Sequence, residues 1–166
     1  MKSYHQLIKL LIRRKLTIAT AESCTGGLIA KLITDVSGSS EVFIGGVVSY
    51  SNTMKMKWLG VRRETLVKFG AVSEQTVAEM LTGIQKETGA DLAIAVSGIA
   101  GPTGGTPEKP VGTVFLGIAF REQHILRKYQ FAGSRDQVRR QAASKAAELI
   151  LDQLSRFETE IPFQES

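Results

Sequence analysis

The chain of 166 residues has little of several residue types on which common protein classes depend. Its one cysteine, Cys24, excludes an internal disulfide and indicates a reducing, cytoplasmic setting. It has two histidines, His5 in an N-terminal helical pattern and His124 in a hairpin turn, so neither a Ser-His-Asp triad nor a histidine metal cluster is expected. The longest apolar run, residues 111–120, is about half of what a bilayer span requires. Charges inside the N-terminal apolar stretch exclude a secretory signal. We therefore expect no contact with membranes.

Charge of one sign is in modest excess. The formal net charge is +5, from 21 Lys and Arg against 16 Asp and Glu. Basic residues gather at positions 13–15 and 135–145, without the interleaved aromatic residues that single-strand nucleic-acid platforms use. The pattern favours solvated helix faces with one local anion site, and it makes a nucleic-acid partner unlikely.

Three motifs of common catalytic folds are also missing. No Gly-x-Ser-x-Gly elbow occurs, no Gly-Lys-Ser/Thr ends a phosphate loop, and no glycine pattern has the form of a dinucleotide fingerprint.

What the sequence has is a mixture of helical and strand patterns. Apolar residues make up 43%, enough for one core, and we expect a single domain over residues 1–166 with a frayed tail after Phe157. Helical spacing or caps predict helices at about 1–12, 23–33, 52–59, 74–86 and from 134 onward, and apolar runs predict strands at 16–21, 42–50, 92–96, 111–120 and 125–131. The last two strands form a hairpin. This order predicts an α/β fold, a three-layer α/β/α sandwich with a mixed, mostly parallel sheet.

In such a sheet ligands bind beyond the carboxyl ends of the strands. Three segments are expected there: residues 21–27, residues 39–55 and the glycine-rich loop 97–110. The first turns sharply into a helix, and its Gly26 and Gly27 let backbone N–H groups approach a ligand. The loop is typical of a phosphate or substrate loop, although plain surface is the alternative.

With no histidine at this edge, a hydrolase built from this chain needs a serine activated by another base. A desolvated lysine can lose its proton near neutral pH and serve that purpose. Tyr50 and Lys55 flank one strand-to-helix junction, so both can face one pocket. Cys24 is the competing nucleophile, but without a nearby histidine a small buried apolar role is favoured.

Five segments at these places carry a resemblance. They are Ala21–Gly27 (AESCTGG), Tyr50–Asn52, Gly70–Ser73, Ser97–Pro102 (SGIAGP) and Lys109–Gly112. In this order they resemble the CinA C-terminal-like family, which includes nicotinamide-nucleotide amidases. The match runs from about residue 5 to residue 155, and the chain looks like the stand-alone form of the family.

The resemblance implies hydrolysis of the carboxamide of nicotinamide mononucleotide, a small nucleotide substrate, to nicotinate mononucleotide and ammonia. It places the nucleophile on Ser40, with Tyr50 and Lys55 as its partners. No metal and no organic cofactor is implied, and a homo-oligomer is expected because small α/β enzymes often form closed symmetric assemblies.

For substrate binding, the resemblance implies contacts from Ser23 and from Ser97, where many relatives have Thr. The resemblance also implies that an arginine at the start of the last helix binds the phosphate, with Arg135 the first choice and Arg139 the second. The same segments supply the other candidate substrate-binding residues: Thr25, Gly26, Gly98, Gly104 and Gly105.

Two alternatives remain open at this point. One is a catalytically silent relative that binds a nucleotide and acts through partners. The other is a competence or damage-response factor associated with DNA, for which salt-sensitive binding is expected.

Overall fold

A computed structural model describes the backbone of residues 2–160 and the side chains of residues 2–156, so the expectation for the tail after Phe157 lies largely outside the described residues. Within this part the helices are α1 (Lys2–Arg14), α2 (Leu28–Thr34), the short 3-10 helix η1 (Ser39–Glu41), α3 (Asn52–Leu59), α4 (Arg63–Phe69), α5 (Glu74–Thr88) and α6 (Arg135–Glu160). The strands are β1 (Ile18–Glu22), β2 (Phe43–Val48), β3 (Leu92–Gly98), β4 (Thr113–Phe120) and β5 (Gln123–Gln130).

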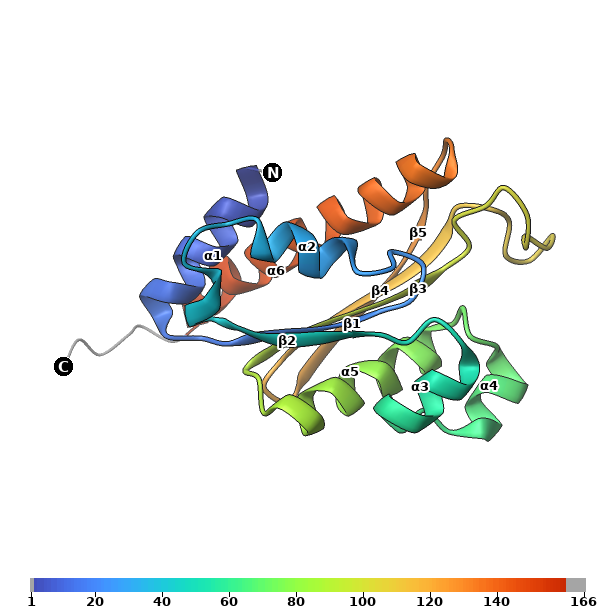
Figure 1. Cartoon of the computed structure of the whole chain (residues 1–166), viewed down its shortest axis with the longest axis horizontal. Coiled ribbons are helices and arrows are strands. Elements are labelled where there is room, and N and C mark those ends of the chain that lie inside the picture. The colour runs from blue at the N-terminus through green and yellow to red at the C-terminus, as the bar shows by residue number, and fades with distance from the viewer. Residues whose placement is uncertain (1, 161–166) are drawn as a thin grey trace.

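The strands form one sheet in the order β2-β1-β3-β4-β5. β1 runs parallel to both β2 and β3, while β4 is antiparallel to β3 and β5. Within the described residues, four of the five strands therefore point the same way, and β4 alone is reversed. Helices α1, α2 and α6 cover one face, and α3, α4 and α5 cover the other (Figure 1). The predicted three-layer sandwich with a mixed sheet is confirmed.

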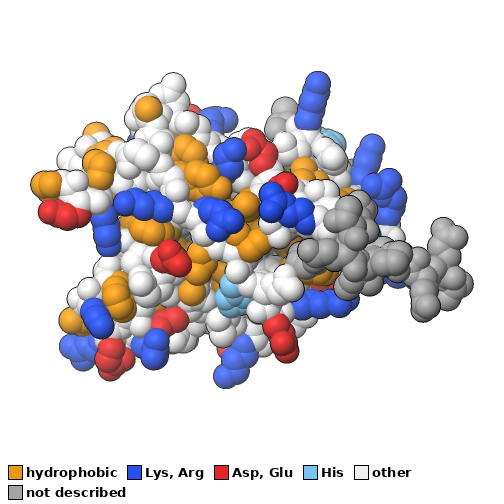
Figure 2. All heavy atoms as spheres, turned by 180° about the vertical axis from the view of Figure 1, so that it is seen from behind, with side chains coloured by type: hydrophobic (Ala, Val, Ile, Leu, Met, Phe, Trp, Pro, Cys, Tyr) orange, Lys and Arg blue, Asp and Glu red, His pale blue; other side chains and the backbone are white. Residues whose placement is uncertain are grey.

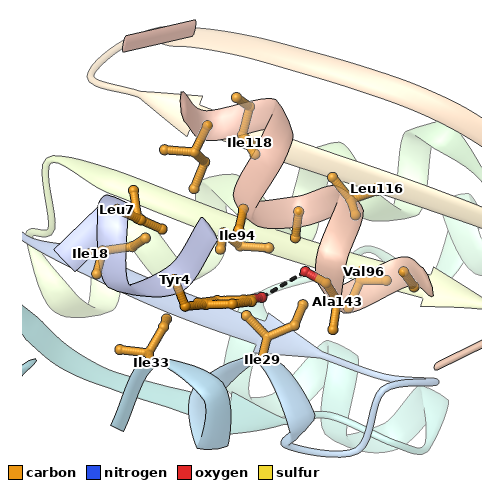
Figure 3. Packing of buried hydrophobic residues seen from close by; sticks show 14 of the residues in the cluster. Tyr4, Leu7, Ile18, Ile29, Ile33, Ile94, Val96, Leu116, Ile118 and Ala143 are labelled. Atoms are coloured by element: carbon orange, nitrogen blue, oxygen red, sulfur yellow. Dashed lines mark hydrogen bonds between the residues drawn. The ribbon is translucent and has the colours of Figure 1, made fainter. Parts of the chain in front are cut away.

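Each face of the sheet carries its own apolar core, because successive strand residues point to opposite faces. Ile18 and Ile94 face α1, α2 and α6, whereas Ala19 and Ala93 face α5. On the first face Tyr4 is buried among isoleucines, and its hydroxyl donates a 2.7 Å hydrogen bond to the carbonyl of Ala143 (Figure 3). This bond ties α1 to α6 across the core.

Several helix boundaries follow the predicted signals, and two differ. Ser73 caps α5 through the backbone N–H of Thr76, and Ser134 forms a capping box with Gln137 at the start of α6. For α3 the sequence offers Asn52 or Thr53 as the cap, but the cap is Ser51, which accepts from the N–H of Met54. Helix α4 was not predicted.

Helix α2 begins at Leu28 instead of at Ser23. A turn occupies residues 23–27, because Gly26 and Gly27 adopt left-handed backbone angles (φ 60° and 90°) that end any continuous helix from Ser23. The serine is thereby left at the end of β1, outside the helix.

Helix α5 approaches α3 closely at Gly83. A methyl group built on Gly83 would overlap the carbonyl oxygen of Leu59, the last residue of α3. This close approach sets the position of α3, the helix that carries Lys55.

Gly83→Ala is therefore expected to destabilise the protein by about 1–3 kcal/mol, because the added methyl group separates the two helices. Helix propensity alone predicts the opposite sign, a gain of about 1 kcal/mol. Urea unfolding measures the difference, and the exposed neighbour Thr82→Ala is the control, with little or no loss. A Gly83→Ala protein as stable as the control would contradict this packing.

Candidate functional site

The carboxyl ends of β1, β2 and β3 meet around a cavity of about 200 Å³. It is lined by Ser23, Cys24, Tyr50, Lys55, Ala71, Val72, Ser97, Gly98, Ala100 and Arg135. Within the described residues, the charged groups of this lining are the two bases, Lys55 and Arg135, with no carboxylate. The cavity therefore suits an anionic ligand.

The central feature of the site is a buried lysine. Lys55 is 1% exposed, and its Nζ lies 2.9 Å from the Oγ of Ser23. The same nitrogen donates to the backbone carbonyls of Ser49, at 2.7 Å, and Tyr50, at 3.4 Å. Residues from β1's end, β2's end and α3 thus converge on one amine.

Burial lowers the pKa of Lys55 from its ordinary 10.5 to about 8, with the nearby Cys24 acting in the opposite direction. No carboxylate bonds the amine among the described residues, so nothing of opposite charge holds the proton there. A sizeable fraction of this lysine is therefore neutral at slightly alkaline pH.

The three partners of Lys55 match what a neutral amine offers. Such an amine has two N–H donors and one lone pair. The carbonyls of Ser49 and Tyr50 can only accept, so they take the two N–H groups. The lone pair then faces the Ser23 hydroxyl, which can donate. In its neutral form Lys55 can therefore accept the proton of the Ser23 hydroxyl, whereas in its protonated form it donates to the same oxygen.

The turn that carries Ser23 is held by its neighbour Glu22, a carboxylate that is 1% exposed. Glu22 accepts from the backbone N–H groups of Gly27, Ile29 and Ala30, at 3.0, 3.1 and 2.8 Å. Glu22 thus accepts the N-terminal N–H groups of α2 that the cap residue, Gly27, leaves without a side-chain acceptor. The helix N-terminus in turn stabilises the negative charge of the carboxylate. The backbone N–H of Ser23 also bonds the carbonyl of Val96 in β3. The serine is fixed from both sides.

Cys24 lies next to Ser23 but is unsuited to attack. It is buried, and burial raises the pKa of its thiol to about 12. The thiol is therefore protonated near neutral pH, in agreement with its expected role as a small apolar side chain.

Two arginines of α6 extend toward this edge of the sheet and have different hydrogen-bond partners. Arg135 donates from Nη2 to the Tyr50 hydroxyl at 3.0 Å and from Nη1 to the Gly101 carbonyl at 2.9 Å. Arg139 donates to the carbonyl of Thr25 at 2.7 Å and does not line the cavity. The arginine that faces the site is thus Arg135.

The end of β3 and the segment before α5 also line the cavity. Ser97 is buried, and its hydroxyl donates to the carbonyl of Ala71 at 2.7 Å. Lys109, near the end of the glycine-rich loop, donates to the carbonyl of Phe69 at 2.8 Å. These bonds join the loop to the segment 69–72. Ala71 and Val72 of the Gly70–Ser73 motif line the cavity as well, although the sequence alone does not assign them to the site.

Of the predicted site residues, the structure brings Ser23, Tyr50, Lys55, Ser97, Gly98 and Arg135 together around the cavity. The remaining substrate-binding candidates, Thr25, Gly26, Gly104, Gly105 and Arg139, do not line it. Thr25 is buried behind the turn, and the two loop glycines are exposed.

Ser40 requires a correction. It lies in η1, before the first residue of β2, whereas Lys55 follows the last. The six residues of β2 separate them by about 20 Å, the length of an extended strand of that size. Within this chain the serine cannot reach Lys55. The side-chain hydroxyl that contacts the Lys55 amine is that of Ser23.

The role expected for Tyr50 also changes. Its carbonyl, not its hydroxyl, contacts Lys55, while the hydroxyl is held by Arg135. The ring is 61% exposed at the mouth of the cavity. Tyr50 is therefore not a partner of Ser40 in this geometry, and its hydroxyl does not contact Lys55.

Across the described side chains, no three His, Cys, Asp or Glu residues gather closely enough to hold a metal ion. No helix within residues 2–160 is both long and apolar enough to cross a bilayer.

A family model described as the CinA C-terminal domain matches residues 1–154. A CinA-like protein of Thermotoga maritima is 56% identical over 142 residues, which cover 86% of this chain and 35% of that protein. A CinA-like protein of Kosmotoga olearia is 51% identical over 144 residues, 87% of this chain and 35% of that protein. The chain thus spans about a third of the length of the curated relatives it matches.

Solved structures agree with the fold. The competence damage-inducible protein A from Klebsiella pneumoniae superimposes with a TM-score of 0.88 at 40% identity, covering 92% of this chain and 97% of that one. The competence/damage inducible protein CihA from Agrobacterium tumefaciens gives a TM-score of 0.85 at 40% identity, covering 90% and 94%.

The buried amine predicts a specific pH dependence of stability. The pKa of Lys55 is about 8 in the folded chain and about 10.5 when unfolded, so between these values the unfolded state binds the extra proton. The free energy of unfolding should then rise with pH in this window, relative to Lys55→Met, by up to about 1.4 kcal/mol per pH unit. Below pH 8 the difference between the two proteins should be constant.

Urea unfolding of both proteins at a series of pH values measures this. The exposed Lys57→Met is the control, for which no such rise is expected. A constant difference between wild type and Lys55→Met up to pH 10.5 would mean that the amine keeps its ordinary pKa.

Proposed function

Because the chain belongs to the CinA C-terminal domain family, we propose that it is an amidohydrolase that converts nicotinamide mononucleotide to nicotinate mononucleotide and ammonia. The names of its relatives refer to competence and damage and state no reaction. The observation that carries the proposal is the 2.9 Å contact between Lys55 Nζ and Ser23 Oγ at a cavity. The resemblance of the site motifs to the amidases of the family supports this substrate.

In the proposed reaction, Lys55 takes the proton of the Ser23 hydroxyl as Oγ attacks the carboxamide carbon. The tetrahedral intermediate collapses when Lys55 returns a proton to the leaving nitrogen, and ammonia departs. Lys55 then takes a proton from water as the water oxygen attacks the resulting ester. The C–Oγ bond breaks as Lys55 returns that proton to Oγ, which releases the carboxylate and regenerates Ser23 and the neutral amine. Each step is a proton transfer or acyl transfer that side chains supply, so the scheme uses neither metal nor cofactor.

The substrate is suited to a lysine base. The pyridinium ring is cationic, which makes the amide carbon electrophilic and disfavours a protonated Lys55 beside it. The phosphate would bind Arg135, which offers bidentate geometry at the start of α6. The ligand's two charges would thus lie against a neutral amine and a permanent cation.

The first test separates the two candidate nucleophiles. Ser23→Ala and Lys55→Met should each reduce ammonia release from nicotinamide mononucleotide by at least about a thousandfold, because each removes half of the reacting pair. Ser40→Ala, at the other end of β2, should keep wild-type turnover. Circular dichroism verifies that all three variants fold.

In the wild type kcat/KM should rise with pH around 8, since only the neutral amine acts as base. A folded wild type without ammonia release would favour the silent nucleotide-binding relative. Loss of activity in Ser40→Ala with activity kept in Ser23→Ala would contradict the assignment of the nucleophile.

The second test concerns the phosphate. Arg135→Ala should raise KM for the nucleotide at least about tenfold, because it removes a charged pair with the phosphate. Arg139→Ala, whose side chain bonds the Thr25 carbonyl away from the cavity, should change KM by less. Steady-state kinetics measures both, and a larger effect at Arg139 would move the phosphate site away from Arg135.

A further inference from the structure

Lys55 differs from the other lysines of the described residues in its environment. It is buried, whereas the others are exposed or half-buried. Figure 2 shows Lys and Arg side chains spread over the surface of one face, where water solvates their charge. The proposed reaction uses the Lys55 amine only as a base. A neutral amine in the wall of a cavity is also a nucleophile for a carbonyl carbon, and desolvated lysines form imines for this reason.

The cavity gives a small ligand access to this amine. Lys55 belongs to the lining of the 200 Å³ space, although the side chain is closed to bulk water. The uncharged part of the lining includes the small residues Ala71, Val72, Gly98 and Ala100, which leave room for a flat ring. The described lining contains no carboxylate that would hold the amine in its protonated form or repel an anion.

A second base marks the other end of this space. Tyr50 contacts both bases: its carbonyl lies 3.4 Å from Lys55 Nζ, and its hydroxyl accepts from Arg135 Nη2 at 3.0 Å. The amine and the guanidinium therefore lie at the two ends of one tyrosine residue. The guanidinium is permanently charged and has the geometry that binds a phosphate. A ligand that uses both bases needs a reactive carbonyl group at one end of an aromatic ring and a phosphate at the other.

We propose that Lys55 is a covalent binding site for small aromatic aldehydes that carry a phosphate, with the aldehyde carbon joined to Nζ as an imine and the phosphate bound by Arg135. The proposal rests on the cavity and its two bases. It does not depend on the proposed hydrolysis, and it adds a class of ligand that is not a substrate of that reaction.

The covalent step needs no further reactant. The lone pair of Nζ attacks the aldehyde carbon, and the two protons of the neutral amine pass to the carbonyl oxygen. This oxygen leaves as water while the C=N bond forms. The Ser23 hydroxyl, 2.9 Å from Nζ, is placed to relay these protons. Because the same lone pair is the base of the proposed reaction, the imine would also stop hydrolysis, a consequence that rests on the proposed function.

Pyridoxal 5′-phosphate is a suitable probe, since it carries an aldehyde and a phosphate on one pyridine ring. The full chain is incubated with it near pH 8, the pKa of the Lys55 amine, and borohydride then reduces any imine to a stable amine. Mass spectrometry should find one pyridoxyl group, on Lys55, at probe concentrations that leave the exposed, protonated lysines unlabelled.

Two variants of α3 test the position. Lys55→Met should lose this label. The control Lys57→Met removes an exposed lysine two residues further along the same helix and should keep the label. Circular dichroism verifies that both variants fold. A label on exposed lysines with Lys55 unmodified would overturn the proposal.

Arg135→Ala tests the phosphate contact. It should raise the concentration of pyridoxal 5′-phosphate needed for half-labelling at least about tenfold, because a charged pair is lost. Labelling by pyridoxal, which lacks the phosphate, should change little. The control Arg140→Ala removes an exposed arginine of α6 that pairs with Asp136 outside the cavity, and it should label like the wild type.

An Arg135→Ala protein that labels like the wild type with the phosphorylated probe would also overturn the proposal. The readout is a mass and not a rate of ammonia release. A chain without amidase activity would therefore still give a clear result, so failure of this proposal and failure of the proposed function are separate outcomes.

Discussion

The site depends on one amine kept out of water. An ordinary lysine is fully protonated at neutral pH and could only donate to a serine hydroxyl, but Lys55 is buried with two carbonyls and a hydroxyl as its partners. Burial costs free energy for the charged form, and that cost is what moves the pKa to about 8. The fold maintains this burial because α3, which carries the lysine, packs closely against α5 at Gly83. The proposed reactivity of Ser23 therefore depends on packing at a distance from it.

The immediate surroundings of the amine favour Ser23 over the adjacent thiol of Cys24 as the proposed nucleophile. Both side chains follow β1, are buried and line the cavity. Ser23 contacts the amine, whereas burial raises the pKa of the Cys24 thiol to about 12. The carboxylate of Glu22 holds the turn to which both belong. Three consecutive residues therefore differ in role: Glu22 holds the turn, Ser23 contacts the amine and Cys24 is a small buried side chain.

Much of the fold could be predicted because its signals are local. Alternating apolar runs gave the strands, and serine caps gave the starts of α5 and α6. Helix α4 was missed because its N-cap, Arg62, makes no side-chain cap bond that a sequence pattern could reveal. For the site, the absence of histidine led to the hypothesis of a serine with a lysine, and the structure brings Ser23 and Lys55 into contact at the cavity. Which serine could not be found from spacing, because it depends on the parallel register that sets Glu22 beside Val48 and brings Ser23 to the amine.

Arg135 has a consequence for how a ligand would enter. Its guanidinium is held at two points, by the Tyr50 hydroxyl and the Gly101 carbonyl, before any ligand arrives. A free arginine must give up several rotatable bonds of freedom when it closes on an anion, a loss of about 0.5–1.5 kcal/mol for each ordered side chain. In Arg135 this freedom is already lost on folding, because two hydrogen bonds hold the guanidinium. An incoming anion would replace one of these hydrogen-bond acceptors and would not have to order a mobile side chain.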